Sequence, residues 1–390
     1  MSLKTRLSVL LISTPALAFV LVGGLLGTAP AATNDAAYKQ LRVFDDVVDL
    51  VMNNYVTEVE ADRAIEGALR GLADGLDPDS AYLMPQMVRA LDGGEPQPEG
   101  DVGLELTRQY YLRVVAARDG SPAQKANLQT GDFVRAINGK PTRDMSVFEG
   151  SRLLRGKPGT KVTLTVIRGN AADPHEIALV REKPSATLVA SRSLEGGVGY
   201  LRVIAFRSGV AQELRQHAAA LASKGAHSLI VDVRRTAEGT YESGLDAARL
   251  FVNSGTLAVK AGREEGGPRQ SIEASAGDGQ IDLPVTLLVT TGTAGPAELF
   301  VSALHGNKRA DIVGERTLGR AGIQKLVRLP EGRGLWLTSA RYLRPDGQPI
   351  QGRGIEPDVD VDEPTPEFGS PAPEKDVILE AALERRRSKV

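Results

Sequence analysis

The sequence contains no cysteine among its 390 residues, and this absence removes several kinds of chemistry at once. Disulfide frameworks, thiol nucleophiles, thiolate metal sites and lipid-modified amino-terminal cysteines are all excluded. Histidine is scarce as well, and the few that occur lack the spacing of metal ligands: His175, His217, His227 and His305. We therefore predict neither a metal centre nor a cofactor.

The sequence also lacks an excess of charge of either sign. Its 47 Lys and Arg residues nearly balance 49 Asp and Glu residues, which gives a formal net charge of −2. Binding to a phosphate backbone needs a strongly basic face, so we expect no nucleic-acid partner. With 42% hydrophobic residues over this length, the chain can bury ordinary cores in about two to three domains.

The amino terminus has the composition of an export signal. Lys4 and Arg6 precede a long uncharged, mostly apolar run that ends in small residues near Ala31 and Ala32. This order of basic flank, apolar core and small residues predicts a secretory signal. Residues 7–31 are also long enough to stay as an anchor in the inner membrane, although Pro15 weakens that interpretation. We expect export to the periplasm or cell envelope, with cleavage favoured over anchoring.

The pattern of apolar residues changes along the chain and divides it into segments. Helical spacing is followed by short alternating runs and then by strands and helices in turn, which is typical of a layered α/β core. We predict an α/β fold of α+β multidomain type. The turn-rich stretch "GLDPDSAYLMP" (75–85) closes the first helices. The predicted boundaries are 1–32 (signal or anchor), 36–90 (helical segment), 98–185 (strand-rich domain), 186–363 (α/β core) and 364–390 (Pro-rich tail with a short helix).

Two stretches of the strand-rich domain, "DVGLEL" (101–106) and "GSPAQKANLQTGDFVRAINGKPT" (120–142), are similar to those of PDZ domains. The resemblance implies that Val102, Gly103 and Leu104 form the loop whose amides capture the carboxylate of a peptide that adds as a strand. Peptides or protein carboxyl termini would then be the partners. The alternative is a PDZ-like scaffold that binds nothing or only holds its neighbour.

The stretch "TGTAGPAELF" (291–300) follows an apolar strand and opens a helix. Such a turn can present a nucleophile, since the free amides at the helix start can hold an oxyanion. Here the apex is Gly295-Pro296, which carries no hydroxyl.

The core resembles the C-terminal processing peptidases, also called tail-specific proteases. The resemblance covers nearly the whole chain after the signal and is carried by "GYLRVIAF", "SLIVDVR", "GTAGPAEL", "VGERTLGRAGIQ" and above all "YLRPDGQPIQGRGIEPD". That family uses a Ser–Lys dyad, with the serine in a turn resembling G-S/T-A-S-A-S-E and the lysine in a stretch resembling G-K-G-x-x-Q. The resemblance places the serine position on Gly295 and the lysine position on Arg320, with Gln324 retained.

The resemblance also locates the oxyanion donors, and both positions are altered. The residue after the serine position is Pro296, which has no N–H, and Glu238 stands where a donor glycine is expected. Glycine cannot form an acyl-enzyme, and arginine stays protonated because its pKa exceeds about 12. We expect Arg320 and Glu238 to form an ion pair that fills the old cleft.

Three hypotheses follow. The first is an exported pseudopeptidase that binds peptides or regulates an active relative, and that self-associates through residues between Phe44 and Leu72. The second is an active serine-type endopeptidase with relocated catalytic residues, although we expect the nearby candidates to point elsewhere: Thr293, Ser302, Lys325 and His305. The third is a structural envelope protein whose groove is closed.

Overall fold

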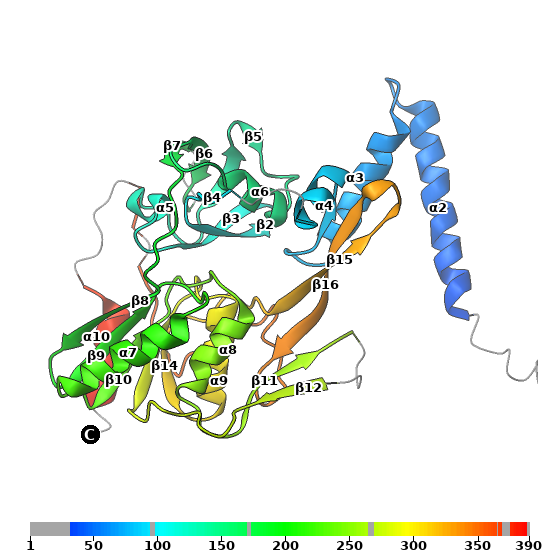
Figure 1. Ribbon diagram of the computed structural model, residues 1–390. Coiled ribbons are helices and arrows are strands. Elements are labelled where there is room, and N and C mark those ends of the chain that lie inside the picture. Colours follow the sequence, from blue (N-terminus) through cyan, green and yellow to red (C-terminus); the bar gives the residue numbers. More distant parts are fainter. Residues whose placement is uncertain are drawn as a thin grey trace, which may run out of the picture. The chain divides into compact units, whose positions relative to one another are not determined.

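The computed structural model describes residues 32–93, 98–169, 173–263, 269–364, 366–368 and 375–387, with side chains from residue 42 onward (Figure 1). The chain divides into two compact units, Met1–Leu69 and Arg70–Val390. Residues 1–31 of the predicted signal lie outside the described part. Within that part, no helix combines the length and the apolar character needed to cross a membrane.

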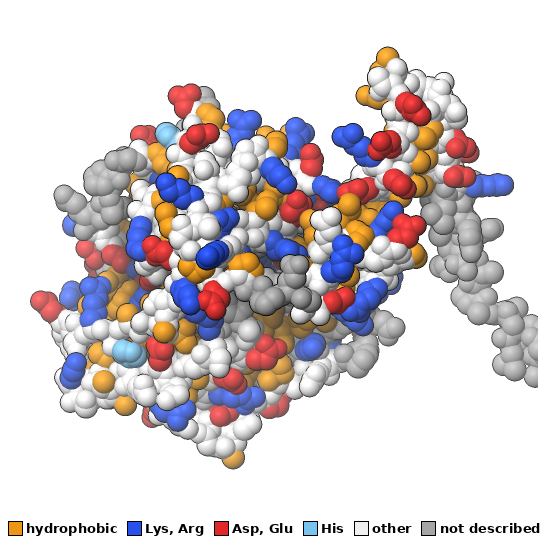
Figure 2. Space-filling model, turned by 45° about the horizontal axis from the view of Figure 1, so that its top comes forward, with side chains coloured by type: hydrophobic (Ala, Val, Ile, Leu, Met, Phe, Trp, Pro, Cys, Tyr) orange, Lys and Arg blue, Asp and Glu red, His pale blue; other side chains and the backbone are white. Residues whose placement is uncertain are grey.

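The first unit consists of the predicted amphipathic helices, α2 (Ala32–Asn54) and most of α3 (Ala61–Asp74). Large apolar side chains of α2 are exposed to solvent, among them Phe44, Val47 and Leu50. Figure 2 shows hydrophobic side chains among charged ones on these helices. The apolar stripe of α2 is therefore available to a partner.

The predicted strand-rich domain forms a sheet in the order β2-β3-β4-β6-β7, with β5 paired to β4. Its core residues alternate along the strands, as in β6, where Val162, Leu164 and Val166 are buried. Strand β2 lies at one edge of the sheet. The elements are β2 (Leu104–Gln109), β3 (Tyr111–Ala117), α5 (Pro122–Lys125), β4 (Phe133–Ile137), β5 (Lys140–Pro141), α6 (Val147–Leu154), β6 (Lys161–Ile167) and β7 (His175–Val180).

The core sheet has the order β17-β14-β13-β10-β9-β8 and is parallel except for the β8–β9 hairpin. Helices α7, α8 and α9 cover one face and α10 packs on the other (Figure 1), so β10 and β13 are buried throughout. The elements are β8 (Val189–Leu194), β9 (Val198–Val203), α7 (Val210–Ser223), β10 (Ser228–Asp232), α8 (Tyr241–Arg249), β13 (Val285–Val289), α9 (Pro296–Gly306), β14 (Ala310–Gly314), β17 (Val359–Asp360) and α10 (Val377–Arg387).

A second sheet joins distant parts of the chain in the order β1-β16-β11-β12, with β15 on β16. Its strands are β1 (Ala81–Leu83), β11 (Thr256–Ala261), β12 (Arg269–Glu273), β15 (Gly322–Arg328) and β16 (Gly334–Leu343). Helix α4 (Pro85–Leu91) follows β1, and the 3₁₀ turn η1 (Pro330–Gly332) connects β15 to β16. The stretch 75–85 was predicted to be turn-rich, and its short strand at Ala81–Leu83, which pairs with β16, was not predicted.

The predicted fold class is confirmed, since the model combines a PDZ-like domain with a layered α/β core. The layering also positions the candidate site. Because β10 and β13 are parallel neighbours, the loops that follow them meet at the same edge of the sheet. The Ala294 N–H donates to the Thr236 carbonyl at 3.0 Å and joins the two loops.

Candidate active site

The turn between β13 and α9 keeps the backbone of a nucleophile elbow without the nucleophile. Gly295 has φ +61° and ψ −121°, a strained conformation that costs glycine little and other residues about 1–3 kcal/mol. A Cβ added to Gly295 would meet only the Ala237 carbonyl oxygen, at 3.5 Å. The space for a side chain is therefore present, and the hydroxyl is missing.

Pro296 occupies the first position of α9 and is buried. Its fixed φ suits a helix start, where an amide would have no partner in the helix. In an oxyanion site that amide is the useful group, and proline lacks it. The donor after the elbow is thus removed by covalent structure.

Glu298 ties the elbow to the segment that carries the lysine position. Its buried carboxylate accepts the N–H groups of Gly295 (3.1 Å), Gly319 (2.7 Å) and Arg320 (2.7 Å) and the hydroxyl of Thr317. Burial raises the pKa of Glu298 to about 7, against the opposing effect of these hydrogen bonds. This role of Glu298 was not predicted from the sequence, although an acid in the first turn of a helix after proline is a recognisable signal.

Arg320 and Glu238 do not form the expected ion pair. Among the described residues, Arg320 pairs with Asp79 at 3.3 Å and donates to the Leu106 carbonyl at 2.6 Å. Glu238 instead pairs with Arg118 at 2.5 Å and with Arg207 at 3.2 Å. The prediction was wrong because the sequence does not show how the PDZ-like domain docks, and that domain supplies Leu106 and Arg118.

Gln324 lies on β15 opposite Thr338 of β16, and its amide donates to the Thr338 hydroxyl at 3.2 Å. The Thr338 N–H donates in turn to the hydroxyl of Ser80, which is held by Asp77. Gln324 is therefore oriented toward the β1–β16 junction. The structure brings the backbones of Gly295 and Arg320 together through Glu298.

The other hydroxyl and basic groups near the turn have separate roles. Thr293 is buried, donates to the Val233 carbonyl at 2.9 Å and accepts the Thr290 N–H at 3.1 Å. Ser302 is buried within α9, and Lys325 is exposed on β15. His305 contacts Asp358 at 3.1 Å near the end of α9. These positions agree with the expectation that each points elsewhere.

The PDZ-like domain covers the turn. Val115 and Ala116 of β3 pack against Ala237, Ala294 and Leu318. The contact is close, because a Cβ added to Gly292 would lie 2.7 Å from the Val115 carbonyl oxygen. The surface above the elbow is thus occupied by the neighbouring domain.

The predicted carboxylate loop, Val102 to Leu104, runs into the first residue of β2. Val102 is buried and Gly103 has φ +73°, where an added Cβ would lie 2.2 Å from that of Ser121. The Gly103 carbonyl accepts the Arg118 N–H at 2.8 Å, so the Leu104 N–H of the same peptide unit points away from β3. Since β2 is an edge strand, this amide faces the side where a further strand can add.

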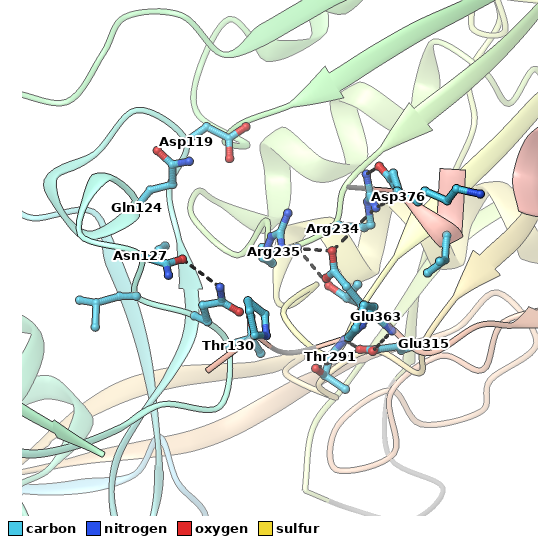
Figure 3. Close-up of a pocket in the computed structure, with 18 residues that line it drawn as sticks. Asp119, Gln124, Asn127, Thr130, Arg234, Arg235, Thr291, Glu315, Glu363 and Asp376 are labelled. Atoms are coloured by element: carbon cyan, nitrogen blue, oxygen red, sulfur yellow. Dashed lines mark hydrogen bonds and ion pairs between the residues drawn. The ribbon is translucent and has the colours of Figure 1, made fainter. Parts of the chain in front are cut away.

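A cavity of about 350 Å³ lies between the PDZ-like domain and the core (Figure 3). Its labelled charged groups already have partners, namely Asp119 with Arg202, Arg234 with Asp376, Arg235 with Glu363, and Glu315 with the Thr291 N–H. Each charged residue that Figure 3 labels in the cavity thus already has a partner within the protein. Within the described ranges, no group of three or more His, Asp or Glu side chains is arranged to hold a metal ion.

Comparison with known proteins assigns a family to each of the two domains. Residues 197–361 match the model of peptidase family S41, and residues 113–168 match that of the PDZ domain. A carboxy-terminal-processing protease of Bartonella bacilliformis is 32% identical over 335 residues, 85% of this chain and 77% of the relative. A carboxyl-terminal-processing protease of Synechocystis is 33% identical over 83% of this chain and 76% of the relative.

Among solved structures, the photosystem II D1 C-terminal processing protease superposes with a TM-score of 0.68 at 28% identity. The match covers 83% of this chain and 90% of that one. The fold is therefore shared with a solved protein.

Proposed function

The chain belongs to peptidase family S41, the family of the carboxy-terminal processing proteases, and on that premise we propose that it is an exported pseudopeptidase. It keeps the scaffold and the PDZ domain, and it binds the carboxyl termini of peptides or proteins without hydrolysing them. The observation that carries the proposal is the elbow at Gly295, whose strained backbone persists with no side chain to attack a carbonyl.

The chemistry of acyl transfer supports inactivity at each step. A nucleophile is absent at Gly295, and the guanidinium of Arg320 cannot accept a proton near neutral pH. The oxyanion would meet Pro296, which has no N–H, and the carboxylate of Glu238, which would repel it. Each of the three tasks (attack, proton transfer and charge stabilisation) thus lacks its group.

The binding half of the proposal is supported by the edge of the PDZ domain. The outward Leu104 N–H, the buried Val102 and the positive φ of Gly103 form a loop suited to a carboxylate, next to the free edge of β2. A peptide would add beside β2 with its carboxyl terminus at this loop. The bound partner is then a free peptide, an exported protein or an active relative that this protein regulates.

Self-association through α2 belongs to the same proposal. Phe44, Val47 and Leu50 are between 46% and 61% exposed, which is unusual for three large apolar side chains on one helix. The basic and apolar composition of residues 1–32 supports export, with the protein acting in the periplasm or cell envelope.

The decisive experiment treats the chain from residue 33 onward with an unfolded casein substrate and with a fluorophosphonate probe, beside an active family member. We expect neither cleavage nor labelling. Cleavage that survives repurification and disappears in Thr293→Val or Ser302→Ala would establish a relocated nucleophile and overturn the proposal.

A further inference from the structure

The guanidinium of Arg320 reaches the peptide-binding edge of the PDZ domain. Leu106 lies opposite Val114, whose N–H and carbonyl bond to Asp132 and Gly131 on the other side, both at 2.8 Å. Residues opposite each other in an antiparallel pair exchange both of their bonds or neither. Both polar groups of Leu106 therefore face the free edge, and Arg320 donates to its carbonyl at 2.6 Å.

Glu238 reaches the same domain near the carboxylate loop. The guanidinium of Arg118 lies against that loop, since a Cβ added to Gly103 would be 3.3 Å from one of its nitrogens. Arg118 is only 7% exposed and binds Asp101 at 2.5 Å and Glu238 at 2.5 Å. A carboxylate from the core is thus already bound beside the loop that would receive a peptide's carboxylate.

The two contacts come from two positions that the family resemblance assigns to catalysis. A glycine would have no side chain with which to bind Arg118. Both contacts of Arg320 are made by one terminal nitrogen of its guanidinium. Asp79 pairs with Arg320 and fixes its direction, and both side chains are mostly buried. The altered catalytic positions and the PDZ edge therefore face each other.

We propose that Arg320 and Glu238 form an intramolecular latch on the PDZ domain, and that a peptide with a free carboxyl terminus binds by displacing it. The Arg320 guanidinium is hydrogen-bonded to the Leu106 carbonyl, which an added strand would need as an acceptor. The Glu238 carboxylate is ion-paired with Arg118. The competition rests on the proposed peptide-binding function, whereas the latch itself does not.

The absence of cysteine allows the latch to be measured directly. Cysteines introduced at the exposed Lys140 and Lys224 carry nitroxide labels, one on the PDZ domain and one on the core. Pulsed electron–electron double resonance then measures the distance between the two labels. We expect one narrow distance in the parent and a broad distribution in the Glu238→Ala/Arg320→Ala variant. Arg328→Ala removes an exposed arginine at the end of β15 and serves as the matched control.

The competition is measured with fluorescein-labelled Gly-Ser-Gly-Ser-Ala-Leu-Val, as the free acid and as the amide. Loss of both contacts should tighten binding of the acid by at least about tenfold and leave the amide unchanged. Glu238→Gln with Arg320→Gln, which removes both charges but keeps more of each side chain than alanine does, repeats the test if the alanine variant unfolds.

The outcomes separate the two claims. A broader distance distribution in the variant, together with tighter binding of the acid, supports the latch and the competition. A broader distance with no binding of either peptide supports the latch and overturns the peptide-binding function. An unchanged distance distribution overturns the latch, and equal affinity of parent and variant for the acid overturns the competition.

Discussion

Restoring the dyad alone should not restore peptidase activity. In Gly295→Ser/Arg320→Lys, the new serine fits the strained turn, since an added Cβ has its nearest neighbour at 3.5 Å. The lysine can act as a base only if it loses its proton. The oxyanion would still face Pro296 and Glu238, so we expect the double variant to stay near background.

The expected deficit follows from the number of missing donors. Removal of one oxyanion donor typically slows catalysis by about 10²–10³-fold. Pro296 removes one donor by covalent structure, and Glu238 replaces the other with a carboxylate that is 21% exposed and paired with Arg118. Two such losses, taken as additive, correspond to about 10⁴–10⁶-fold.

The assay compares the double variant with a quadruple variant that adds Pro296→Ala and Glu238→Gly. The rate of labelling by a fluorophosphonate and the turnover of unfolded casein are measured at matched thermal stability. We expect labelling above background only in the quadruple variant. Turnover of the double variant equal to that of the quadruple variant would refute our assignment of the oxyanion positions.

Three further predictions concern stability and assembly. Burial raises the pKa of Glu298 to about 7, so its contribution of about 3 kcal/mol to the free energy of unfolding should be complete below pH 4.5 and lost as the pH rises through 7. Urea unfolding at several pH values should show this trend, and Glu298→Gln should remove it. Arg234→Met leaves the buried Asp232 carboxylate without its bidentate partner and should cost about 3–5 kcal/mol in the same assay, unlike an exposed arginine. Phe44→Glu/Val47→Glu should reduce the sedimentation coefficient to that of a monomer, and an unchanged value would exclude α2 as the interface.

The sequence predicted the elements of the core because their signals are local. Helix α9 follows Gly295-Pro296 as expected, and β10 and β13 are continuous apolar runs. Strand β1 was missed because its three residues follow turn formers and pair only with the distant β16. Short segments that depend on long-range pairing carry little local signal.

The site was predicted by position but not by contact. The resemblance located Gly295 and Arg320, and the backbone geometry there agrees with an elbow. The partners of Arg320, Asp79 and the Leu106 carbonyl, lie more than 200 residues earlier in the sequence. Such contacts depend on domain docking, which no spacing within the sequence specifies.

The observed partners of Arg320 and Glu238, rather than the predicted ion pair between them, compensate the two buried charges. A buried charge without a partner is costly, so each of these two charged residues needs a partner at its position. Arg320 found Asp79 and the Leu106 carbonyl, and Glu238 found Arg118. Docking of the PDZ domain therefore depends on the residues at both positions, because Glu238→Gly removes the ion pair with Arg118 and Arg320→Ala removes the contacts with Asp79 and the Leu106 carbonyl.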